Sequence, residues 1–483
     1  MISKARKTGS PAGSRRGPAD KVRRSWLASV AICSLLLAAA LAWTWWRKQE
    51  PQKPPTTSGS SVIPAAKQTS LDPGADAGRV VAEAATLKRE AVAVAHQAAA
   101  AYPNDGLAYA LMGSAYYNTG QSDEAVKHLR RCLELSPNQA EAREILARVA
   151  YEKGELEESV RHCEEALKRG PANREVLNRL GRALMDLGRT DEAVQTLQQA
   201  VRLPKPTSES FYLLGQGNLQ SGDYVQAKES FGRAIALLPD HTQAFFGLYT
   251  ACMRLGQAEE AERYREQFLK LEAIDRRTLT DRSAQEDTLT GLPLVRKTVA
   301  RTFFGAAQIY RVHEDSEKAA ELFLKSATLD ADNPVYRSAL EAHYTQRKAL
   351  AEGVKVFEQL VRQQPESSLN YLFLGRLQAR LEQFDAAEGA YRKVQELASD
   401  WSEGYRALAE LYLRADRKPS EAWALARRVI ELEPSAPHYY LLALACLKNN
   451  DRAGALEAMN QAVALSPGEK EYQQFLQQLK RAP

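Results

Sequence analysis

Hydrophobic and polar positions follow a helical period over most of this sequence. In residues 80–275 and 300–469, apolar residues recur three or four positions apart, and charged residues fill many of the positions between them. This spacing predicts amphipathic α-helices, each of which buries one apolar stripe. The sequence therefore predicts an all-α protein made of short paired helices.

The same two stretches contain a repeat of 34 residues, most clearly marked by small residues. One series consists of Gly120, Gly154, Gly188, Gly222 and Gly256. A second series consists of Ala125, Ser159, Ala193, Ala227 and Ala261, and a third of Pro137, Pro171 and Pro239. Small residues let two helices approach closely, while larger residues fill the remaining space between them. A period of this length predicts a stack of helix hairpins.

Four copies of the repeat begin with a large residue that is followed, three and four positions later, by an apolar residue and a glycine. These are Tyr109-x-x-Met112-Gly113, Leu177-x-x-Leu180-Gly181, Phe211-x-x-Leu214-Gly215 and Tyr371-x-x-Leu374-Gly375. With its 34-residue period, this pattern resembles the tetratricopeptide repeat family. The resemblance covers about four-fifths of the chain and implies a right-handed superhelical solenoid of about ten helix hairpins.

The repeat phase divides the chain into two blocks with an insertion between them. The first block, 80–275, contains a degenerate copy at 80–105 and repeats at 106–139, 140–173, 174–207, 208–241 and 242–275. The second block, 300–469, contains repeats at 300–333, 334–367, 368–401, 402–435 and 436–469. One extra residue lies near Lys418-Pro419, and the amphipathic stretch in 470–483 is expected to cap the last repeat.

The insertion, 276–299, is too polar for a buried helix in its first part. We expect a helix to run past residue 275, to stop at Thr290-Gly291 and to restart there. Two interpretations remain open: an extended rigid hairpin that keeps one superhelix continuous, which we favour, or a hinge between two arms.

The amino terminus predicts a membrane anchor. Residues 1–25 form a basic tail, and the uncharged run 26–46 would span about 31 Å as a helix, enough to cross a bilayer. Eight basic residues precede this run and two directly follow it, which predicts a cytoplasmic amino terminus. A signal peptide cleaved near Ala40-Leu41-Ala42 and a mitochondrial presequence are the alternatives. The Pro-, Ser- and Thr-rich residues 47–79 are interpreted as a linker.

Charge and motifs argue against nucleic-acid binding and against catalysis. Residues 1–48 have a local charge of +9, which leaves −4 for residues 49–483, so the repeats carry no basic excess for nucleic acid. The sequence contains no nucleophile elbow, phosphate-binding loop, zinc-protease motif or calcium loop. We therefore expect no enzyme activity and no cofactor.

One cluster of His and Cys residues bears on metal binding. His128 and Cys132 lie on one predicted helix, and His162 and Cys163 lie on the equivalent helix of the next repeat. A soft-metal site or a Cys132–Cys163 disulfide is therefore conceivable. Both cysteines, however, occupy positions where the repeat needs a small apolar residue, so we expect core cysteines and no metal.

In the family that this chain resembles, the first helix of each hairpin lines a concave groove that holds peptides of partner proteins. The first-helix residues that lie off the packing stripe are therefore the candidate partner-binding residues. In the first block they are Tyr117, Asn118, Arg148, Tyr151, Asn178, Arg182, Tyr212, Gln216 and Phe246. In the second block they are Phe304, Gln308, Arg311, Arg376, Arg380, Arg406, Arg414, Tyr440 and Lys448. Because Arg376, Arg380, Arg406 and Arg414 gather in two repeats, acidic segments are an expected ligand.

The function expected from these observations is a non-enzymatic scaffold that binds proteins or peptides. Tethered by residues 26–46 to a bacterial inner membrane, it would hold its repeats in the periplasm and serve cell-envelope assembly. The lack of an N-x-[ST] sequon and of a disulfide framework favours this compartment over a eukaryotic lumen. The alternative is an accessory subunit that docks a separate catalytic partner, such as a glycan or cofactor-attachment enzyme.

Overall fold

The computed structural model describes residues 73–289 and 291–481, and every regular element within them is an α-helix. The predictions for residues 1–72, which include the basic tail, the apolar run 26–46 and most of the linker, lie outside the described residues. Among the helices that are described, none is both long and apolar enough to cross a membrane. The all-α prediction is confirmed for the described part of the chain.

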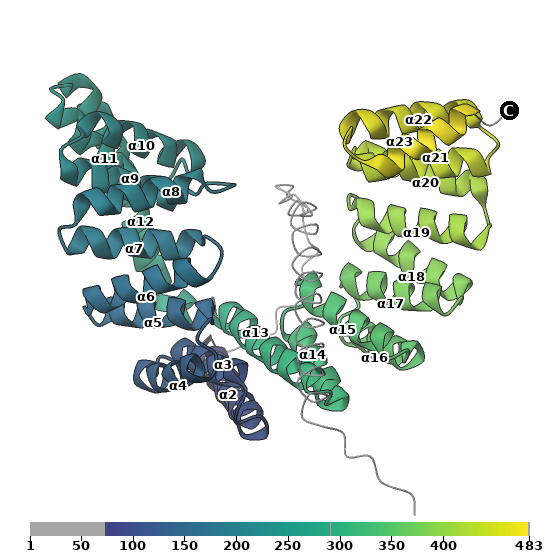
Figure 1. Ribbon diagram of the computed structural model, residues 1–483, viewed down its shortest axis with the longest axis horizontal. Helices are drawn as coiled ribbons and strands as arrows, with labels where there is room; N and C mark the ends of the chain where they lie inside the picture. The colour runs from purple at the N-terminus through teal and green to yellow at the C-terminus, as the bar shows by residue number, and fades with distance from the viewer. Residues whose placement is uncertain (1–72, 290, 482–483) are drawn as a thin grey trace, which may run out of the picture. The chain divides into compact units, whose positions relative to one another are not determined.

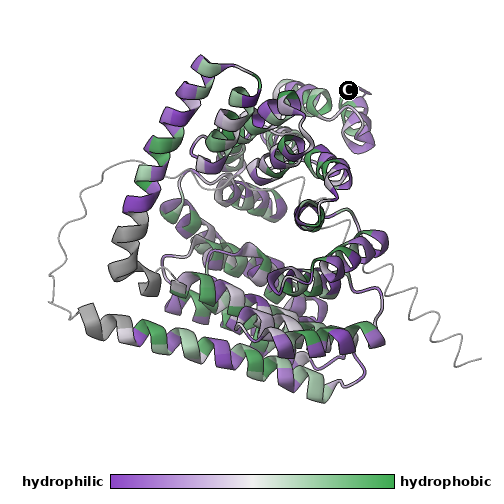
Figure 2. Cartoon of the chain, turned by 90° about the vertical axis from the view of Figure 1, so that its left-hand side faces the viewer, coloured by the Kyte–Doolittle hydropathy of each residue, from purple (hydrophilic) through white to green (hydrophobic). Residues whose placement is uncertain are grey.

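The helices follow one another as hairpins, which Figure 1 shows as successive stacked pairs. The first helices are α2 (Pro73–Ala101), α3 (Gly106–Asn118), α4 (Ser122–Leu135), α5 (Ala140–Glu152), α6 (Leu156–Arg169), α7 (Arg174–Asp186), α8 (Thr190–Arg202), α9 (Ser208–Ser221), α10 (Tyr224–Leu237), α11 (Thr242–Arg254) and α12 (Ala258–Leu289). They are followed by α13 (Gly291–Val312), α14 (Ser316–Leu329), α15 (Pro334–Gln346), α16 (Leu350–Gln363), α17 (Ser368–Arg380), α18 (Phe384–Leu397), α19 (Ser402–Ala415), α20 (Pro419–Leu432), α21 (Ala436–Lys448), α22 (Arg452–Leu465) and α23 (Lys470–Arg481). Figure 2 shows the hydrophobic and hydrophilic residues interleaved along these helices, as amphipathic helices require.

Glycine at the close-packing positions lets the two helices of a hairpin touch. A Cβ atom added to Gly181 would lie 2.5 Å from Leu197 Cγ, and one added to Gly215 would lie 2.6 Å from Phe231 Cδ1. A Cβ atom on Gly375 would lie 2.5 Å from a ring carbon of Tyr391. The first helix therefore has no room for a side chain opposite the large residue of the second helix. The prediction that Gly181 and Gly215 lie at helix contacts is confirmed.

The turns within the hairpins use a left-handed residue, and the two blocks supply it differently. In the first block this residue is always glycine, and its φ lies between 72° and 84° at Gly120, Gly154, Gly188, Gly222 and Gly256. In the second block the equivalent residues are Glu314, Lys348, Glu382, Asp416 and Asn450, with φ between 53° and 64°. The turn is otherwise the same: the N–H of Gln121 bonds the carbonyl of Tyr116 at 2.9 Å, and the N–H of Ala349 bonds that of Tyr344 at 2.9 Å. Left-handed backbone is strained for residues with a Cβ atom, so the hairpin turns of the second block carry strain that those of the first block avoid.

Replacing a left-handed residue of the second block with glycine is expected to stabilise the protein. Lys348→Gly and Glu382→Gly should each raise the free energy of unfolding by about 0.5–1 kcal/mol, because glycine relieves the strain but loses more entropy on folding. Gly154→Ala, which introduces the same strain into the first block, should lower it by about 1 kcal/mol. Urea unfolding followed by circular dichroism measures all three. A loss of stability in both glycine variants would contradict this account.

The insertion between the blocks is helical almost throughout. Helix α12 runs to Leu289 and α13 begins at Gly291, so the predictions of a helix past residue 275 and of a stop and restart near Gly291 are confirmed. Residues 80–105 do not form a degenerate hairpin, because they contain only the single helix α2 and the residues that follow it. The helix that covers α2 is α13 instead, which begins in the insertion and continues as the first helix of the repeat 300–333.

Helix α13 packs against α2 and α3, at the beginning of the first block. Ala91, Val94 and Ala98 of α2 share one hydrophobic core with Val299 and Phe303 of α13. Since both interpretations of the insertion had the second block follow the end of the first, neither anticipated this contact. The physical reason is that the described residues contain no first helix that forms a hairpin with α2, so α13 buries the part of its apolar stripe that α3 leaves open.

Polar contacts join the same helices. The Arg296 guanidinium of α13 donates to Glu83 Oε1 of α2 at 2.5 and 3.0 Å. The His313 ring, just after α13, lies 2.8 Å from Asp105 Oδ2 and stacks on Tyr102 with ring centroids 3.8 Å apart. These contacts link residues more than 200 positions apart in the sequence.

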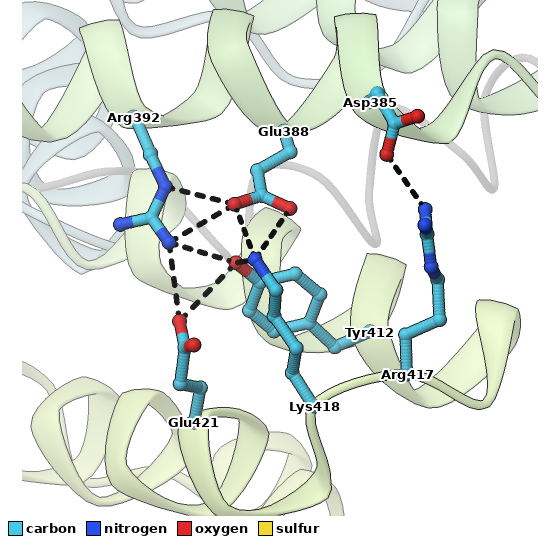
Figure 3. A network of polar contacts seen from close by, with 7 residues as sticks. All are labelled: Asp385, Glu388, Arg392, Tyr412, Arg417, Lys418 and Glu421. Atoms are coloured by element: carbon cyan, nitrogen blue, oxygen red, sulfur yellow. Dashed lines mark hydrogen bonds and ion pairs between the residues drawn. The ribbon is translucent and has the colours of Figure 1, made fainter.

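The extra residue of the repeat 402–435 is accommodated by a second left-handed residue, Lys418, whose φ is 47°. Figure 3 shows its side chain reaching back to Glu388 of α18, with Nζ 2.7 and 3.0 Å from the two carboxylate oxygens. Arg392 donates to Glu388 at 3.0 Å and to Glu421 of α20 at 3.1 Å. Burial alone would raise the pKa of Glu388, but the hydrogen bonds from Lys418, Arg392 and Tyr412 lower it to about 2. The extra residue near Lys418 is thus held in place by a network of ion pairs and hydrogen bonds around Glu388.

Candidate functional site

The first helices of the first block form a continuous surface, called here the first-block face. Consecutive first helices α3, α5, α7, α9 and α11 contact one another. The Tyr117 hydroxyl of α3 donates to Glu152 of α5 at 2.6 Å, and the Tyr151 hydroxyl of α5 donates to Asp186 of α7 at 2.6 Å. Burial and the bond to Asp186 raise the pKa of Tyr151 to about 12. The tyrosines expected to bind a partner therefore also hold neighbouring repeats in register.

Arginines lie beside these tyrosines. The Arg148 guanidinium lies over the Tyr117 ring, 5.4 Å from its centroid, and one of its nitrogens is 3.3 Å from Glu144 Oε1. Arg182, on the next first helix, donates to Glu209 of α9 at 2.5 Å. The face therefore carries cations that are only partly paired.

Five buried polar atoms on α5 and α7 have no hydrogen-bond partner among the described residues: Arg143 Nε, Arg148 Nε, Arg174 Nε, Asn178 Oδ1 and Arg179 Nη1. Arg143 and Arg174 lie at the beginnings of these helices and donate through another nitrogen to backbone carbonyls, which leaves Arg148, Asn178 and Arg179 as a group. Burial, reinforced by the nearby Arg148 charge, lowers the pKa of Arg179 below its usual value. Among the described residues Arg179 forms no hydrogen bond or ion pair, and Glu144 is the one carboxylate that acts on it. Buried polar atoms without partners are uncommon in folded proteins and call for a ligand or water. We name Arg148, Asn178 and Arg179 the α5–α7 cluster.

The other end of the first-block face is apolar. Phe246 of α11 is 50% exposed and Met253, on the same helix, is 52% exposed. The Phe246 ring contacts Phe268 of α12, with centroids 5.3 Å apart. On α9, Gln216 donates to the Tyr212 hydroxyl at 2.8 Å, so the two side chains of this first helix are joined to each other.

In the second block, the protein's own carboxylates compensate most of the charge of Arg376, Arg380, Arg406 and Arg414. These are the arginines that the sequence predicts to bind acidic ligands. Arg376 pairs with Glu403 at 2.5 Å, and Glu403 also accepts from Arg406 at 2.8 Å. Arg406 pairs in addition with Glu410. Burial opposes ionisation of Glu403, yet the bonds from Arg406 and Arg376 hold its pKa below the usual value.

A further carboxylate, Glu341 of α15, lies 3.8 Å from Arg376 and 3.5 Å from Arg380. Burial raises the pKa of Glu341, and its side chain is only 8% exposed. Of the four arginines, Arg414 alone has no ion pair within the described part of the chain. An acid-binding wall in the second block would therefore have to displace the protein's own carboxylates.

The remaining candidate residues have varied surroundings. Phe304 packs on Phe323 and Tyr336, and Tyr440 packs on Tyr472 and Phe475 of α23, so both rings contribute to the core. Lys448 pairs with Asp416 at 2.7 Å. The other three are exposed or half-buried side chains, namely Asn118, Gln308 and Arg311, of which Arg311 donates to Gln308 at 2.9 Å.

Sequence reasoning missed Arg179, Glu341 and Arg337. Arg337 is fully buried and donates to Asn370 Oδ1 at 2.6 Å and to Gln364 Oε1 at 3.1 Å. A usable signal was present: in the repeat 334–367, Arg337 and Glu341 stand at the positions that hold Tyr371 and Gly375 in the next copy. Charged residues at packing positions mark a repeat that departs from simple hairpin packing.

The four His and Cys residues weighed for a metal do not converge. Cys132 and Cys163 are free and buried, and burial raises the pKa of their thiols to about 11 and about 12. Across residues 73–289 and 291–481, no three His, Cys, Asp or Glu side chains are grouped so as to hold a metal ion. His162 lies instead beside a cavity of about 290 Å³ between α4, α5 and α6, where its Nε2 is 3.1 Å from Glu158.

The protonation of His162 makes stability depend on pH. Burial, together with the charges of Arg143, Arg161 and Arg130, lowers the pKa of His162 to about 4, whereas an unfolded histidine titrates near about 6.5. As the pH falls from about 6.5 to about 4, the unfolded chain takes up a proton that the folded protein refuses, so stability decreases by about 2 kcal/mol. His162→Gln should lose less stability over this range in urea unfolding at several pH values. Equal losses in the two proteins would show that His162 is not responsible.

Comparison with known proteins adds the following. A tetratricopeptide repeat model matches residues 81–140, 110–174, 146–206, 339–401 and 405–470, and a second tetratricopeptide repeat model matches residues 218–267. None of the curated proteins matches the chain.

Several solved structures resemble parts of the chain. MamA is 21% identical, covers 34% of this chain and 97% of its own, and has a TM-score of 0.33. YrrB, described as a tetratricopeptide repeat protein with an unusual peptide-binding site, is 21% identical, covers 39% of this chain and 97% of its own, and has a TM-score of 0.35. Yeast Tom70 is 16% identical, covers 78% of this chain and 95% of its own, and has a TM-score of 0.34.

Proposed function

This chain belongs to the tetratricopeptide repeat family, and we propose that it is a non-enzymatic, membrane-tethered scaffold that binds segments of partner proteins through its first-block face. Repeats of this family are protein-interaction modules, so the coarse assignment, protein binding, follows from membership. The choice of surface, ligand chemistry and membrane attachment is our proposal.

The observation that carries the choice of surface is the α5–α7 cluster. Two guanidinium groups there keep buried N–H donors without acceptors, and one carboxylate, Glu144, opposes them. A carboxylate on a bound segment would accept from both arginines, and such charge-assisted bonds are stronger than neutral ones. The acidic segment expected from the sequence is therefore assigned to the first block, since the second block already has its own carboxylates.

Membrane attachment is proposed from residues 26–46 and the charges around them. Fusion of a reporter after Pro483 that is active only outside the cytoplasm should give activity, because the basic tail predicts that the remainder of the chain is exported. Activity of a cytoplasm-only reporter at the same position would contradict the proposed periplasmic location.

Partner capture tests the binding surface. Full-length protein is cross-linked in native membranes, purified and analysed by mass spectrometry, with Arg148→Met/Arg179→Met compared against wild type. The double variant should lose most captured partners while its circular dichroism is unchanged, because Glu144, the carboxylate that pairs with Arg148, keeps the hydrogen bond from Asn173. The matched control, Arg414→Met, removes an exposed arginine of the second block and should retain them. Equal recovery by all three proteins would contradict a role of the first-block face.

The same experiment separates the scaffold from an accessory subunit. Recovery of several partners supports a scaffold in cell-envelope assembly. Recovery of one stoichiometric enzyme would favour a subunit that docks a glycan or cofactor-attachment enzyme at the membrane.

A further inference from the structure

The chemistry of the first-block face changes systematically along its helices. Asn178, Tyr212 and Phe246 are 34 residues apart and occupy the same repeat position on α7, α9 and α11. The face therefore passes from a polar end at α5–α7 to an aromatic end at α11.

The polar end has unmet hydrogen-bonding capacity that is mostly of one kind, since Asn178 Oδ1 is the one acceptor of the α5–α7 cluster without a donor. Arg148 Nε and Arg179 Nη1 are donors without acceptors, and both belong to cations. Arg182, the nearest further cation on α7, is already paired with Glu209. An anionic oxygen from outside the chain is thus the group that this end lacks, and a carboxylate suits two guanidinium groups best.

The apolar end exposes large apolar side chains to water. Phe246 and Met253 are each about half exposed, although large apolar side chains in a repeat helix usually pack away from water. Tyr249 and Phe268 lie against Phe246, with ring centroids 6.0 and 5.3 Å away, so the exposed residues rest on an aromatic base. A large apolar side chain could be buried on this base.

The distance between the two ends determines how many residues must separate the two anchoring side chains of a bound segment. Packed helices lie about 8–10 Å apart, so the two steps from α7 to α11 cover about 20 Å. An extended chain advances about 3.3–3.6 Å per residue, which converts that distance into about six residues. Between the ends, Gln216 and Tyr212 are bonded to each other, and neither carries a charge.

We propose that the first-block face recognises an extended partner segment with two anchors: a carboxylate at the α5–α7 cluster and, about six residues away, a large apolar side chain at Phe246 and Met253. The inference rests on the proposed function and adds the spacing and the chemistry of the partner. Two anchors on one segment reinforce each other because the second binds intramolecularly.

Binding of model peptides to the full-length protein in detergent tests this, with empty micelles as the blank. Fluorescein-labelled peptides of a Gly/Ser background carry one Glu and one Phe, in either order, spaced by about six residues or by about two. Further peptides replace the Glu with Gln or the Phe with Ser. The wide spacing, in one of the two orders, should bind about tenfold tighter than the narrow spacing or than either single-anchor peptide.

Variants then assign each anchor to its end of the face. Arg179→Met should weaken the two-anchor peptide to the level of the Gln peptide and leave the Gln peptide unchanged. Phe246→Ser should weaken it to the level of the Ser peptide and leave that peptide unchanged. The controls are Arg414→Met and Leu465→Ser, which remove an exposed arginine and an exposed leucine of the second block and should change nothing.

The outcomes separate this inference from the proposed function. Binding that is independent of spacing, or equal losses for all peptides in Arg179→Met and Phe246→Ser, would overturn the two-anchor inference. Partner capture that still depends on Arg148 and Arg179 would leave the scaffold function standing. Loss of both results would overturn both.

Discussion

Asn370→Ala is expected to lower the free energy of unfolding by about 3–4 kcal/mol, because it leaves a buried cation without its nearest acceptor. Arg337 is fully buried, and its partners are Asn370, Gln364 and the carbonyl of Asp330, none of them a carboxylate side chain. Burial lowers the pKa of Arg337 to about 10, so it remains charged at neutral pH. Urea unfolding followed by circular dichroism, with hydrogen exchange of α15–α17, measures the loss.

The matched control is Asn138→Ala, which removes an asparagine that accepts from Arg169 at 2.9 Å on the exposed surface. Its effect should stay within about ±0.5 kcal/mol. The double replacement Arg337→Met/Asn370→Leu should recover most of the lost stability, since it removes the charge together with its acceptor. If Asn370→Ala and Asn138→Ala lowered the free energy of unfolding equally, the buried network around Arg337 would contribute no more to stability than an exposed hydrogen bond.

Gly181→Leu should lower the free energy of unfolding by about 3 kcal/mol, at the upper end of what overpacking causes. Even the Cβ atom would lie 2.5–2.9 Å from three carbons of Leu197, so α7 and α8 would have to separate. Urea unfolding provides the measurement. Gly232→Leu is the control, because a Cβ atom there meets nothing within 4 Å; the better helix propensity of leucine should leave the stability unchanged or raise it by up to about 1 kcal/mol. Similar losses in the two variants would mean that the contact with Leu197 is not the cause, because the better helix propensity of leucine should favour both variants.

The hairpins could be predicted from the sequence because each copy repeats the same local pattern. Gly181 and Gly215 indicate a close contact between two helices, and a glycine every 34 residues indicates a turn with left-handed backbone. The second block shows the limit of that signal. Its turns have the same backbone without glycine, because five similar hairpins impose the conformation on Glu314 and its equivalents.

The candidate site could be predicted only in part. Arg148, Asn178 and Tyr117 were identified, because a repeat register assigns residues to a face. The sequence could not show whether Arg376 pairs with Glu403 or remains available for a ligand. The two residues belong to different repeats, and their distance depends on how the repeats stack. The packing of α13 on α2 could not be predicted, because the amphipathic pattern of each helix shows that it has an apolar stripe but not which helix covers that stripe.

The contact between α2 and α13 also bears on how the chain is made. Glu83 and Arg296 are separated by 213 positions, and ribosomes add about 5–20 residues per second, so α2 waits about 10–40 s for the helix that covers it. During that interval the apolar stripe of Ala91, Val94 and Ala98 lacks its later partners Val299 and Phe303, while the hairpins from α3 onward can already form. Synthesis of this protein therefore includes a period in which a nearly complete first block displays an aggregation-prone edge, and slowing translation before residue 291 would lengthen it.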